Sequence, residues 1–283
     1  MNTPPLPTVM FESLVRATLL EDLGRAGDLT TDAVVPAGLD AELTLTARQR
    51  GVVAGLDVAA LAFRLIDPAI SVKVERPDGS AVLPGDVIAS VCGPARGLLT
   101  AERTALNFLC HLSGIATATA SIVEVIKGHK AQIVCTRKTT PGLRALEKYA
   151  VRAGGGSNHR FGLDDAILIK DNHIAIAGGI RPAIERARAH AGHMVKIEVE
   201  VDTLAQLQEV LSLGADAVLL DNMSPEQLAR AVEITGGRAI TEASGRVTRE
   251  TAPAIAASGV DLISVGWITH SSPVLDIGLD YRA

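Results

Sequence analysis

Two adjacent cationic side chains, Arg137 and Lys138, stand in the sequence TRKTTPG, directly after the apolar run 133–135. An apolar run of this kind is typical of a buried strand, so the two charges are expected where that strand ends. A guanidinium group binds a carboxylate or a phosphate through two hydrogen bonds, and an ammonium group adds a point charge. The residue types and their position therefore predict an anion-binding turn.

A block of positive charge surrounds this turn. Between Thr136 and His173 the chain carries seven Lys and Arg residues against four Asp and Glu residues, although its net charge is -5. A local excess of cations in an acidic chain indicates a focused anion site. Arg160 and Lys170 fall on turns or strand ends and are expected to bind the ligand. Three other residues have helical spacing and are expected to form a solvated helix face: Arg144, Glu147 and Lys148.

Three consecutive glycines precede His159 and Arg160 in GGGSNHR. Because each glycine costs chain entropy on folding, such a run has a reason in the fold or in the site. Three interpretations are open: approach of backbone N–H groups to a ligand, close packing of another segment, or a simple helix end followed by a loop. His159, next to Arg160, is expected to belong to the same anion site.

Carboxylates and small residues occupy the later strand ends. Glu200 and Asp221 could accept hydrogen bonds from sugar hydroxyls, hold Mg²⁺ through water, or pair with the nearby cations. Glu198 is expected to face elsewhere if its strand is regular. Small residues could present backbone N–H groups to a phosphate at three positions: Ser244, Gly245 and Gly266. The predicted ligand is therefore a phosphorylated sugar next to a carboxylate-bearing partner.

Alternating strands and helices must position these residues. Six β-rich runs, with helical patterns between most of them, span 133–136, 166–170, 195–201, 217–220, 239–241 and 262–265. This alternation predicts a parallel sheet, and the lack of a GxGxxG turn argues against a dinucleotide-binding unit. We expect an incomplete α/β barrel, because six strands are fewer than the usual eight. In such barrels the carboxyl ends of the strands carry the active site.

The first part of the chain has a different, α+β character. Helices are expected at 11–23 and 56–67, a strand at 42–46 and short strands with turns between 71 and 93. From Thr100 a long helical pattern follows, predicted as two helices meeting at Ser113-Gly114, with Thr100 as N-cap. The expected domains are an N-terminal α+β domain at 1–105 and a barrel at 106–269. A C-terminal tail at 270–283 is expected to pack back on the first domain.

Composition narrows the class of protein. With 2% aromatic residues and a net charge of -5, the 283-residue chain is not expected to bind nucleic acid or an anionic membrane. Three scattered cysteines favour reduced thiols and a cytoplasmic location. The first residues lack the pattern of a secretion signal, and no apolar run approaches the roughly 20 residues that cross a bilayer.

Long ordered motifs carry a family resemblance. The segment TRKTTPGLRALEKYAVRAGGGSNHRFGLDDAILIKDNH closely resembles quinolinate phosphoribosyltransferase, as do EDLGRAGDLTT, GPARGLLTAERTALNFLCHLSGIATAT, KIEVEVDT, VLLDNMSPEQL, EASG and ISVGWITHS. The resemblance implies transfer of phosphoribose from 5-phosphoribosyl 1-pyrophosphate to quinolinate with Mg²⁺ and loss of CO2, on the route to NAD. It also implies an N-terminal α+β sandwich-like domain and a C-terminal incomplete α/β barrel. The implied assembly is a homodimer with shared sites, in some members a hexamer.

The matching motifs also imply a role for each site residue. Quinolinate would be held by Arg103 of the partner subunit together with Arg137, His159 and Arg160. A catalytic set would contact carboxylate, phosphate, ribose and the metal-bound pyrophosphate: Lys138, Lys170, Glu200 and Asp221. The 5′-phosphate would lie at Ser244, Gly245 and Gly266. Arg246 stands where the family often has a small or apolar residue, and its side chain could also bind phosphate.

Three alternatives share part of this pattern. A molybdenum-transport-associated relative shares TRKT and HR, but LIKDNH and the full ERTALN segment favour quinolinate chemistry. A barrel lyase or aldolase would use Lys170 as a Schiff base, which needs a desolvated, neutral amine. A non-catalytic sensor of phosphorylated sugars would bind the ligand without releasing pyrophosphate.

Overall fold

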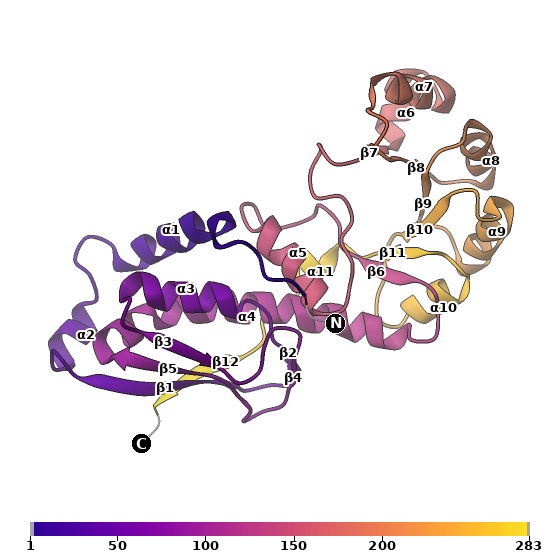
Figure 1. The fold of residues 1–283 in the computed structure, drawn as a ribbon. Coiled ribbons are helices and arrows are strands. Elements are labelled where there is room, and N and C mark those ends of the chain that lie inside the picture. The colour runs from indigo at the N-terminus through magenta and orange to yellow at the C-terminus, as the bar shows by residue number, and fades with distance from the viewer. Residues whose placement is uncertain (1–2, 282–283) are drawn as a thin grey trace. The chain divides into compact units, whose positions relative to one another are not determined.

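The computed structural model describes residues 3–281. Residues 1–2 and 282–283, which the expected first domain and tail include, lie outside the described part. The chain divides into two compact units (Figure 1). Unit 1 comprises Met1–Ala120, Thr139–Gly155 and Thr269–Ala283, and unit 2 comprises Ser121–Lys138 and Gly156–Ile268.

A four-stranded antiparallel sheet forms the centre of unit 1. Its strands, in the order β12-β1-β5-β3, are Ile277–Tyr281, Asp40–Ala47, Val87–Pro94 and Ser71–Val74. The C-terminal strand β12 is thus hydrogen-bonded to β1, with Leu279 opposite Leu45. A separate two-stranded ladder joins β2 (Gly51–Val52) to β4 (Ala81–Val82). The predicted α+β character of this part is confirmed, and the structure shows that its sheet is antiparallel.

Helices accompany this sheet along the chain. They are η1 (Thr8–Met10), α1 (Glu12–Leu23), α2 (Leu29–Val34), α3 (Leu56–Ile66) and α5 (Arg144–Ala153). Helix α3 is mostly buried, and a side chain from a loop more than 20 residues away caps its N-terminus. The carboxylate of Asp78 accepts hydrogen bonds from the backbone N–H groups of Gly55 and Leu56 at 2.9 and 3.2 Å. Tyr149 on α5 donates its hydroxyl to the same carboxylate at 2.7 Å.

Helix α4 (Ala95–Val125) is one continuous helix of 31 residues, so the predicted break at Ser113-Gly114 is wrong. A side chain at Gly114 would place its Cβ 2.2 Å from the carbonyl oxygen of Pro273. The glycine therefore lets another segment approach and does not end a helix. Thr100 lies inside α4 and is not its N-cap; its hydroxyl donates to Asp28 at 3.1 Å.

By length and composition alone, α4 is the only helix in the described part that could cross a membrane. The sequence shows no long apolar run here, because polar but uncharged residues such as Asn107, Ser113 and Thr119 interrupt the apolar residues of the helix. Of its most apolar window, 56% is buried inside the protein. This burial is what a core helix of a globular protein shows.

Unit 2 contains a parallel sheet of six strands. In sheet order they are β6 (Gln132–Val134), β11 (Leu262–Ser264), β10 (Ile240–Ser244), β9 (Ala217–Asp221), β8 (Ile197–Val201) and β7 (Ile167–Ile169). Consecutive strands from β7 to β11 are neighbours, and β11 returns to pair with β6. Only the β6–β7 pairing that would close a ring is missing among the described strands. The predicted incomplete barrel is therefore confirmed.

Ser157 of the glycine loop pairs with the free edge of β6. Its backbone N–H donates to Ile133 at 2.8 Å, and its carbonyl accepts from Cys135 at 3.2 Å. Gly154 makes a close approach in unit 1, since an added Cβ would lie 2.3 Å from the carbonyl oxygen of Ala116. Close packing is thus one reason for the glycine run in GGGSNHR.

The helices of unit 2 line the outside of the curved sheet (Figure 1). They are α6 (Asp171–Ala177), α7 (Ile180–His190), α8 (Leu204–Leu213), α9 (Pro225–Thr235) and α10 (Ala252–Ala257). The short helix α11 (Trp267–His270) follows β11, and its last two residues belong to unit 1. Capping boxes start α8 at Thr203 and α9 at Ser224. Along β8, buried Ile197, Val199 and Val201 alternate with partly exposed glutamates. The sheet therefore has an apolar face under the helices and a polar inner face.

Candidate active site

The strand ends of unit 2 gather the predicted polar residues. Lys170 follows β7 directly, Glu200 lies in β8, and Asp221 and Ser244 are the last residues of β9 and β10. Asp221 and Ser244 are register partners. Because all six strands are parallel, these positions lie at the same edge of the sheet, which is the functional edge of α/β barrels.

Glu198 and Glu200 share the inner face of β8, so the expectation that Glu198 faces elsewhere is wrong. Side chains two residues apart in a regular strand point to the same side. Leu219 on β9 is the register partner of Glu200 on one side and of Glu242 on the other. The inner face therefore carries several carboxylates beneath the strand ends.

Lys170 and Glu200 form an ion pair, with Nζ 3.0 Å from Oε2. The lysine side chain is 50% exposed, whereas the glutamate side chain is 13% exposed. A half-exposed ammonium group paired with a carboxylate differs from the desolvated amine that a Schiff-base enzyme needs. The geometry therefore disfavours the aldolase alternative.

Arg137 and Arg160 lie close enough in unit 2 for their positive charges to interact. Arg160 donates from Nη1 to the carbonyl oxygen of Ala166 at 2.9 Å. Partial burial, together with the neighbouring charge of Arg137, lowers the pKa of Arg160. Nε of Arg137 is buried and has no hydrogen-bond partner within the described chain. Buried donors are nearly always paired in proteins, so this atom is suited to receive an anionic ligand.

Lys138 extends along the end of β11. Its backbone N–H donates to Oγ1 of Thr136 at 3.0 Å. A Cβ added to Gly266 would lie 3.0 Å from Cδ of Lys138. Gly266 thus leaves space for the lysine side chain, and the predicted contact of its backbone with phosphate remains a prediction.

Two residues with positive φ shape the turns after β9 and β10. Asn222 has φ 53° and Arg246 has φ 47°, and they are the only non-glycine residues in this conformation along the described chain. Asn222 donates its backbone N–H to Ser244 at 2.9 Å and its side-chain amide to Asp221 at 2.6 Å. Its Oδ1 would lie 2.3 Å from a Cβ added to Gly245. Asn222 therefore orients a predicted catalytic carboxylate, a role that the sequence analysis missed.

A cluster of His159, Glu198 and Glu242 lies on the inner face, with ligand atoms within 4.8 Å of one another. Nε2 of His159 is 2.9 Å from Glu198 and 3.6 Å from Glu242. Burial and the adjacent Glu198 carboxylate raise the pKa of Glu242 to about 7. Glu198 and Glu242 stand near strand ends in the sequence but were given no role in the predicted site; the period of two in IEVEV was the available signal for the first.

The predicted solvated helix face is wrong for Glu147 and Lys148. Both residues are buried, with 0% and 1% exposure. The Glu147 carboxylate is 2.9 Å from Nε2 of His111 and accepts from the backbone N–H of Thr140 at 3.0 Å. Arg144, which is partly exposed, donates to Oγ1 of Thr139 at 3.1 Å. Helix α5 therefore anchors the second half of TRKTTPG within unit 1.

Arg103 lies on α4 in unit 1 and is exposed.

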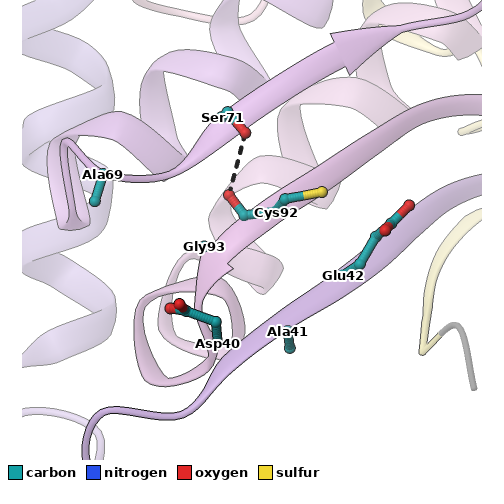
Figure 2. A pocket seen from close by; sticks show the side chains of 7 residues that line it. All are labelled: Asp40, Ala41, Glu42, Ala69, Ser71, Cys92 and Gly93. Atoms are coloured by element: carbon teal, nitrogen blue, oxygen red, sulfur yellow. Dashed lines mark hydrogen bonds between the residues drawn. The ribbon is translucent and has the colours of Figure 1, made fainter.

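Unit 1 also contains a shallow hollow of about 440 Å³ along its sheet, lined by Asp40, Glu42, Ser71 and Cys92 among others (Figure 2). The charged side chains in this lining are both carboxylates. Such a hollow repels anions, so it does not compete with the strand ends of unit 2 as the predicted site.

The sequence matches two domain families over most of its length. Residues 28–113 match "Quinolinate phosphoribosyl transferase, N-terminal domain", and residues 115–280 match its C-terminal domain. The chain belongs to the quinolinate phosphoribosyltransferase family. This confirms the resemblance carried by the sequence motifs, and the boundary between the two family domains falls inside α4.

Relatives of known name cover nearly the whole of this family member. A probable nicotinate-nucleotide pyrophosphorylase [carboxylating] of Bacillus subtilis is 45% identical, covering 96% of this chain and 93% of the relative. A Mycobacterium leprae protein named nicotinate-nucleotide pyrophosphorylase [carboxylating] is 47% identical, with 94% and 95% covered. The crystal structure of NadC from Streptococcus pyogenes aligns with TM-score 0.94 and 41% identity, over 99% of this chain and 100% of that one.

Proposed function

We propose that the protein transfers phosphoribose from 5-phosphoribosyl 1-pyrophosphate to quinolinate. The products are nicotinate mononucleotide, pyrophosphate and CO2, which places the enzyme in de novo NAD biosynthesis. Relatives at 45% and 47% identity carry the name of this activity. The same names favour this reaction over that of the molybdenum-transport-associated relative.

The unpaired, buried Nε of Arg137 is the observation that carries this assignment. It lies close enough to Arg160 for the two charges to interact. Holding two guanidinium groups together is unfavourable unless an anion lies between or above them. A pyridine with two carboxylates on adjacent ring carbons supplies two such anions, and each guanidinium can bind one of them with two hydrogen bonds.

The reaction depends on holding the two substrates in position, and it needs no side-chain nucleophile. The pyridine nitrogen attacks C1 of the ribose while the C1–oxygen bond to pyrophosphate breaks. The quaternary ring nitrogen then accepts the electron pair left when the adjacent carboxylate departs as CO2, and a proton replaces it on carbon. Well-held reactant pairs reach effective molarities of about 10⁵ M or more.

Four side chains at the strand ends form the proposed catalytic set: Lys138, Lys170, Glu200 and Asp221. The two lysines place positive charge near carboxylate and phosphate oxygens. The two carboxylates face the ribose hydroxyls and stabilise positive charge that develops at C1. Their position at neighbouring strand ends makes this assignment possible.

Mg²⁺ is the proposed cofactor, bound mainly through the pyrophosphate of the substrate. Glu200 and Asp221 offer carboxylate oxygens, which are the ligand type that this ion prefers, so the donor set fits. When bound, the ion stabilises the negative charge of the leaving pyrophosphate. Lys170 and Asn222 hold these two carboxylates in place through the contacts at 3.0 and 2.6 Å.

The 5′-phosphate is proposed to bind at the ends of β10 and β11. Ser244 and Gly245 offer backbone N–H groups on a turn with φ 105° at Gly245, and Gly266 follows β11. Arg246 supplies an exposed positive charge at this turn. Its positive φ is costly for a residue with a Cβ, which fits a position kept for a ligand.

A cytoplasmic homodimer is the proposed assembly, with the hexamer as its possible extension. Large apolar side chains are exposed on unit 1, including Val9 at 83% and Leu29 and Val34 at 70%. Exposed apolar residues of this kind favour association. In this assembly Arg103 of one copy reaches quinolinate bound by the other, and all three cysteines stay reduced.

A pyrophosphate-release assay tests the proposal. With phosphoribosyl pyrophosphate and Mg²⁺, quinolinate should give pyrophosphate, CO2 and nicotinate mononucleotide in equal amounts, whereas nicotinate should give none. Release with nicotinate and without CO2 would contradict the assignment. Binding of both ligands without any product would favour the sensor alternative, and borohydride trapping at Lys170 would favour the aldolase alternative.

A further inference from the structure

His159 uses both nitrogens of its ring for contacts within the protein. Nδ1 lies 2.8 Å from the backbone nitrogen of Arg160, and Nε2 lies 2.9 Å from Oε2 of Glu198. The side chains of His159 and Glu198 are only 13% and 12% exposed. Both hydrogen bonds are therefore well shielded from water.

These two partners define the state of the ring. A backbone N–H can only donate, so Nδ1 of His159 must be the unprotonated acceptor. The carboxylate of Glu198 accepts, so Nε2 must carry the proton. The hydrogen-bond pattern thus assigns the neutral Nε2–H tautomer to His159, and the Glu198 carboxylate selects it.

The same pattern argues against a metal ion in the cluster of His159, Glu198 and Glu242. A metal bound at Nε2 would displace the proton, and the neutral ring would then carry its proton on Nδ1. That proton would point at the backbone N–H of Arg160, where two donors would face each other. The cluster therefore fits a shared proton network and does not fit a cation site.

Glu242 completes this cluster beside His159 and Glu198. It is 1% exposed, and its Oε2 lies 3.6 Å from Nε2 of His159. Two adjacent carboxylates in a buried place cannot both be ionised at low cost. Burial and Glu198 raise the pKa of Glu242 to about 7.

The hydrogen bonds of His159 also restrain Arg160. Its backbone is fixed by Nδ1 of His159, and its guanidinium group by Ala166 at 2.9 Å. The neighbouring positive charge of Arg137 tends to push the two guanidinium groups apart. An anchor on the Arg160 backbone resists this repulsion.

We propose that Glu198 is a positioning residue for the dicarboxylate substrate. Its carboxylate holds His159 in the tautomer that anchors the Arg160 backbone, which keeps the guanidinium group of Arg160 beside that of Arg137. The inference rests on the proposed function, since it deepens the quinolinate-binding role of the two arginines. The catalytic contacts remain those of Arg137 and Arg160, and Glu198 acts only through His159.

Steady-state kinetics with a double-mutant cycle tests this route. Glu198→Ala should raise KM for quinolinate at least about tenfold and leave KM for phosphoribosyl pyrophosphate within about twofold. Glu198→Gln should have a smaller effect, because its amide oxygen can still accept from Nε2. In His159→Asn, the Asn Oδ1 can accept from the Arg160 N–H without help, so adding Glu198→Ala should change little. Glu209→Gln on the exposed side of α8 is the matched control.

Three kinetic results would overturn the proposal. They are an unchanged quinolinate KM in folded Glu198→Ala, an equal rise in both KM values, and additive effects in the double variant. Melting temperatures establish that each variant is folded, and Glu198→Gln provides the same test if Glu198→Ala does not fold.

Nitrogen NMR of histidine-labelled, ligand-free protein gives a readout that does not need activity. The signals that disappear in His159→Asn should show an Nε2–H tautomer in the wild type and a mixture of tautomers in Glu198→Ala. An Nδ1–H tautomer in the wild type, or a shift of these signals on adding one equivalent of Zn²⁺, would overturn the proposal. A wild type that releases no pyrophosphate with quinolinate would instead overturn the proposed function alone.

Discussion

Two buried glutamates, one in each unit, differ in the hydrogen-bond partners of their carboxylate oxygens. Glu147 in unit 1 is fully buried, and each of its oxygens has a partner, His111 on one side and the Thr140 N–H on the other. Glu242 in unit 2 is equally buried, yet its Oε1 has no hydrogen-bond partner in the described chain and its pKa rises to about 7. The two buried carboxylates therefore differ in how completely the chain satisfies their oxygens, and Glu242 in addition lies next to the Glu198 carboxylate, which with burial raises its pKa.

The difference extends to the units as a whole. Unit 2 also holds the unpaired Nε of Arg137 and both non-glycine residues with positive φ. Such costs persist where a ligand or a reaction compensates for them. The buried polar groups around Glu147 in unit 1 have hydrogen-bond partners, whereas Arg137 and Glu242 in unit 2 each have a buried atom without one, as expected for the proposed ligand site.

The division of roles between the units predicts complementation between subunits, which is the largest expected effect. Arg103→Ala in unit 1 and Lys170→Ala in unit 2 should each be nearly inactive. Mixing and re-forming the dimers should restore about a quarter of wild-type activity, because half of the dimers are mixed and each mixed dimer has one intact site. No recovery after proven subunit exchange would count against a shared site.

Removal of either arginine of the proposed quinolinate site in unit 2 should affect binding. Arg137→Ala is expected to weaken quinolinate binding by about 2–4 kcal/mol, as for a severed buried charge contact, and Arg160→Ala similarly. Titration calorimetry measures the loss. Arg230→Ala, an exposed arginine paired with Glu233, is the control and should leave binding unchanged. An unchanged quinolinate constant in Arg137→Ala would refute the assignment.

Removal of the satisfied glutamate from unit 1 should affect stability. Glu147→Ala leaves the Thr140 N–H and the His111 ring without their acceptor, so the free energy of unfolding should fall by about 1–3 kcal/mol. Urea denaturation measures this change. The exposed, helix-surface Glu12→Ala should cost well below 1 kcal/mol by comparison. Equal losses in the two variants would mean that the buried contacts contribute little.

The unsatisfied glutamate of unit 2 should make stability depend on pH. The pKa of Glu242 is about 7 in the folded protein and 4.5 as its ordinary value. The folded state thus binds more protons in this window, and stability falls as pH rises from 4.5 to 7. Glu242→Gln should remove this fall, which is about 2–3 kcal/mol between pH 5 and pH 8, so that it gains stability relative to the wild type at pH 8.

Unfolding curves for both proteins at pH 5 and pH 8 provide the measurement. Glu209→Gln, which is exposed on α8, should follow the wild type at both values. A constant difference between Glu242→Gln and the wild type across this range would mean that Glu242 keeps its ordinary titration.

Relief of backbone strain at Arg246, in the turn after β10, should change stability by the smallest amount. Arg246 has φ 47°, and Arg246→Gly relieves that strain, so stability should rise by up to about 1 kcal/mol. If the side chain binds the 5′-phosphate, KM for phosphoribosyl pyrophosphate should rise several-fold in the same variant. The nearby Arg249→Gly lacks the positive φ and should be slightly destabilised. A stabilised variant with unchanged KM would leave Arg246 outside the site.

Local patterns were sufficient for most of the elements and for the positions of the candidate residues at the strand ends. The six strands of unit 2 lie where the β-rich runs predicted them, and the charged residues that follow them lie at one edge. The helical pattern also predicted α8 and α9, whose capping residues are visible in the sequence. It could not show that α4 is continuous, because the reason for Gly114 lies in its contact with Pro273.

What the sequence by itself determined is therefore the order of most strands and helices and the excess of positive charge around the strand ends, from which an anionic ligand was predicted. These follow from period and charge, which are properties of neighbouring residues. Only the tertiary structure decided that Glu147 and Lys148 are buried, that Asn222 holds Asp221, and that His159 meets Glu198. The last pair is 39 residues apart in the chain, and the strand register and the folding of the glycine loop bring the two side chains together. Contacts of this kind depend on how distant segments pack, and no local pattern specifies that.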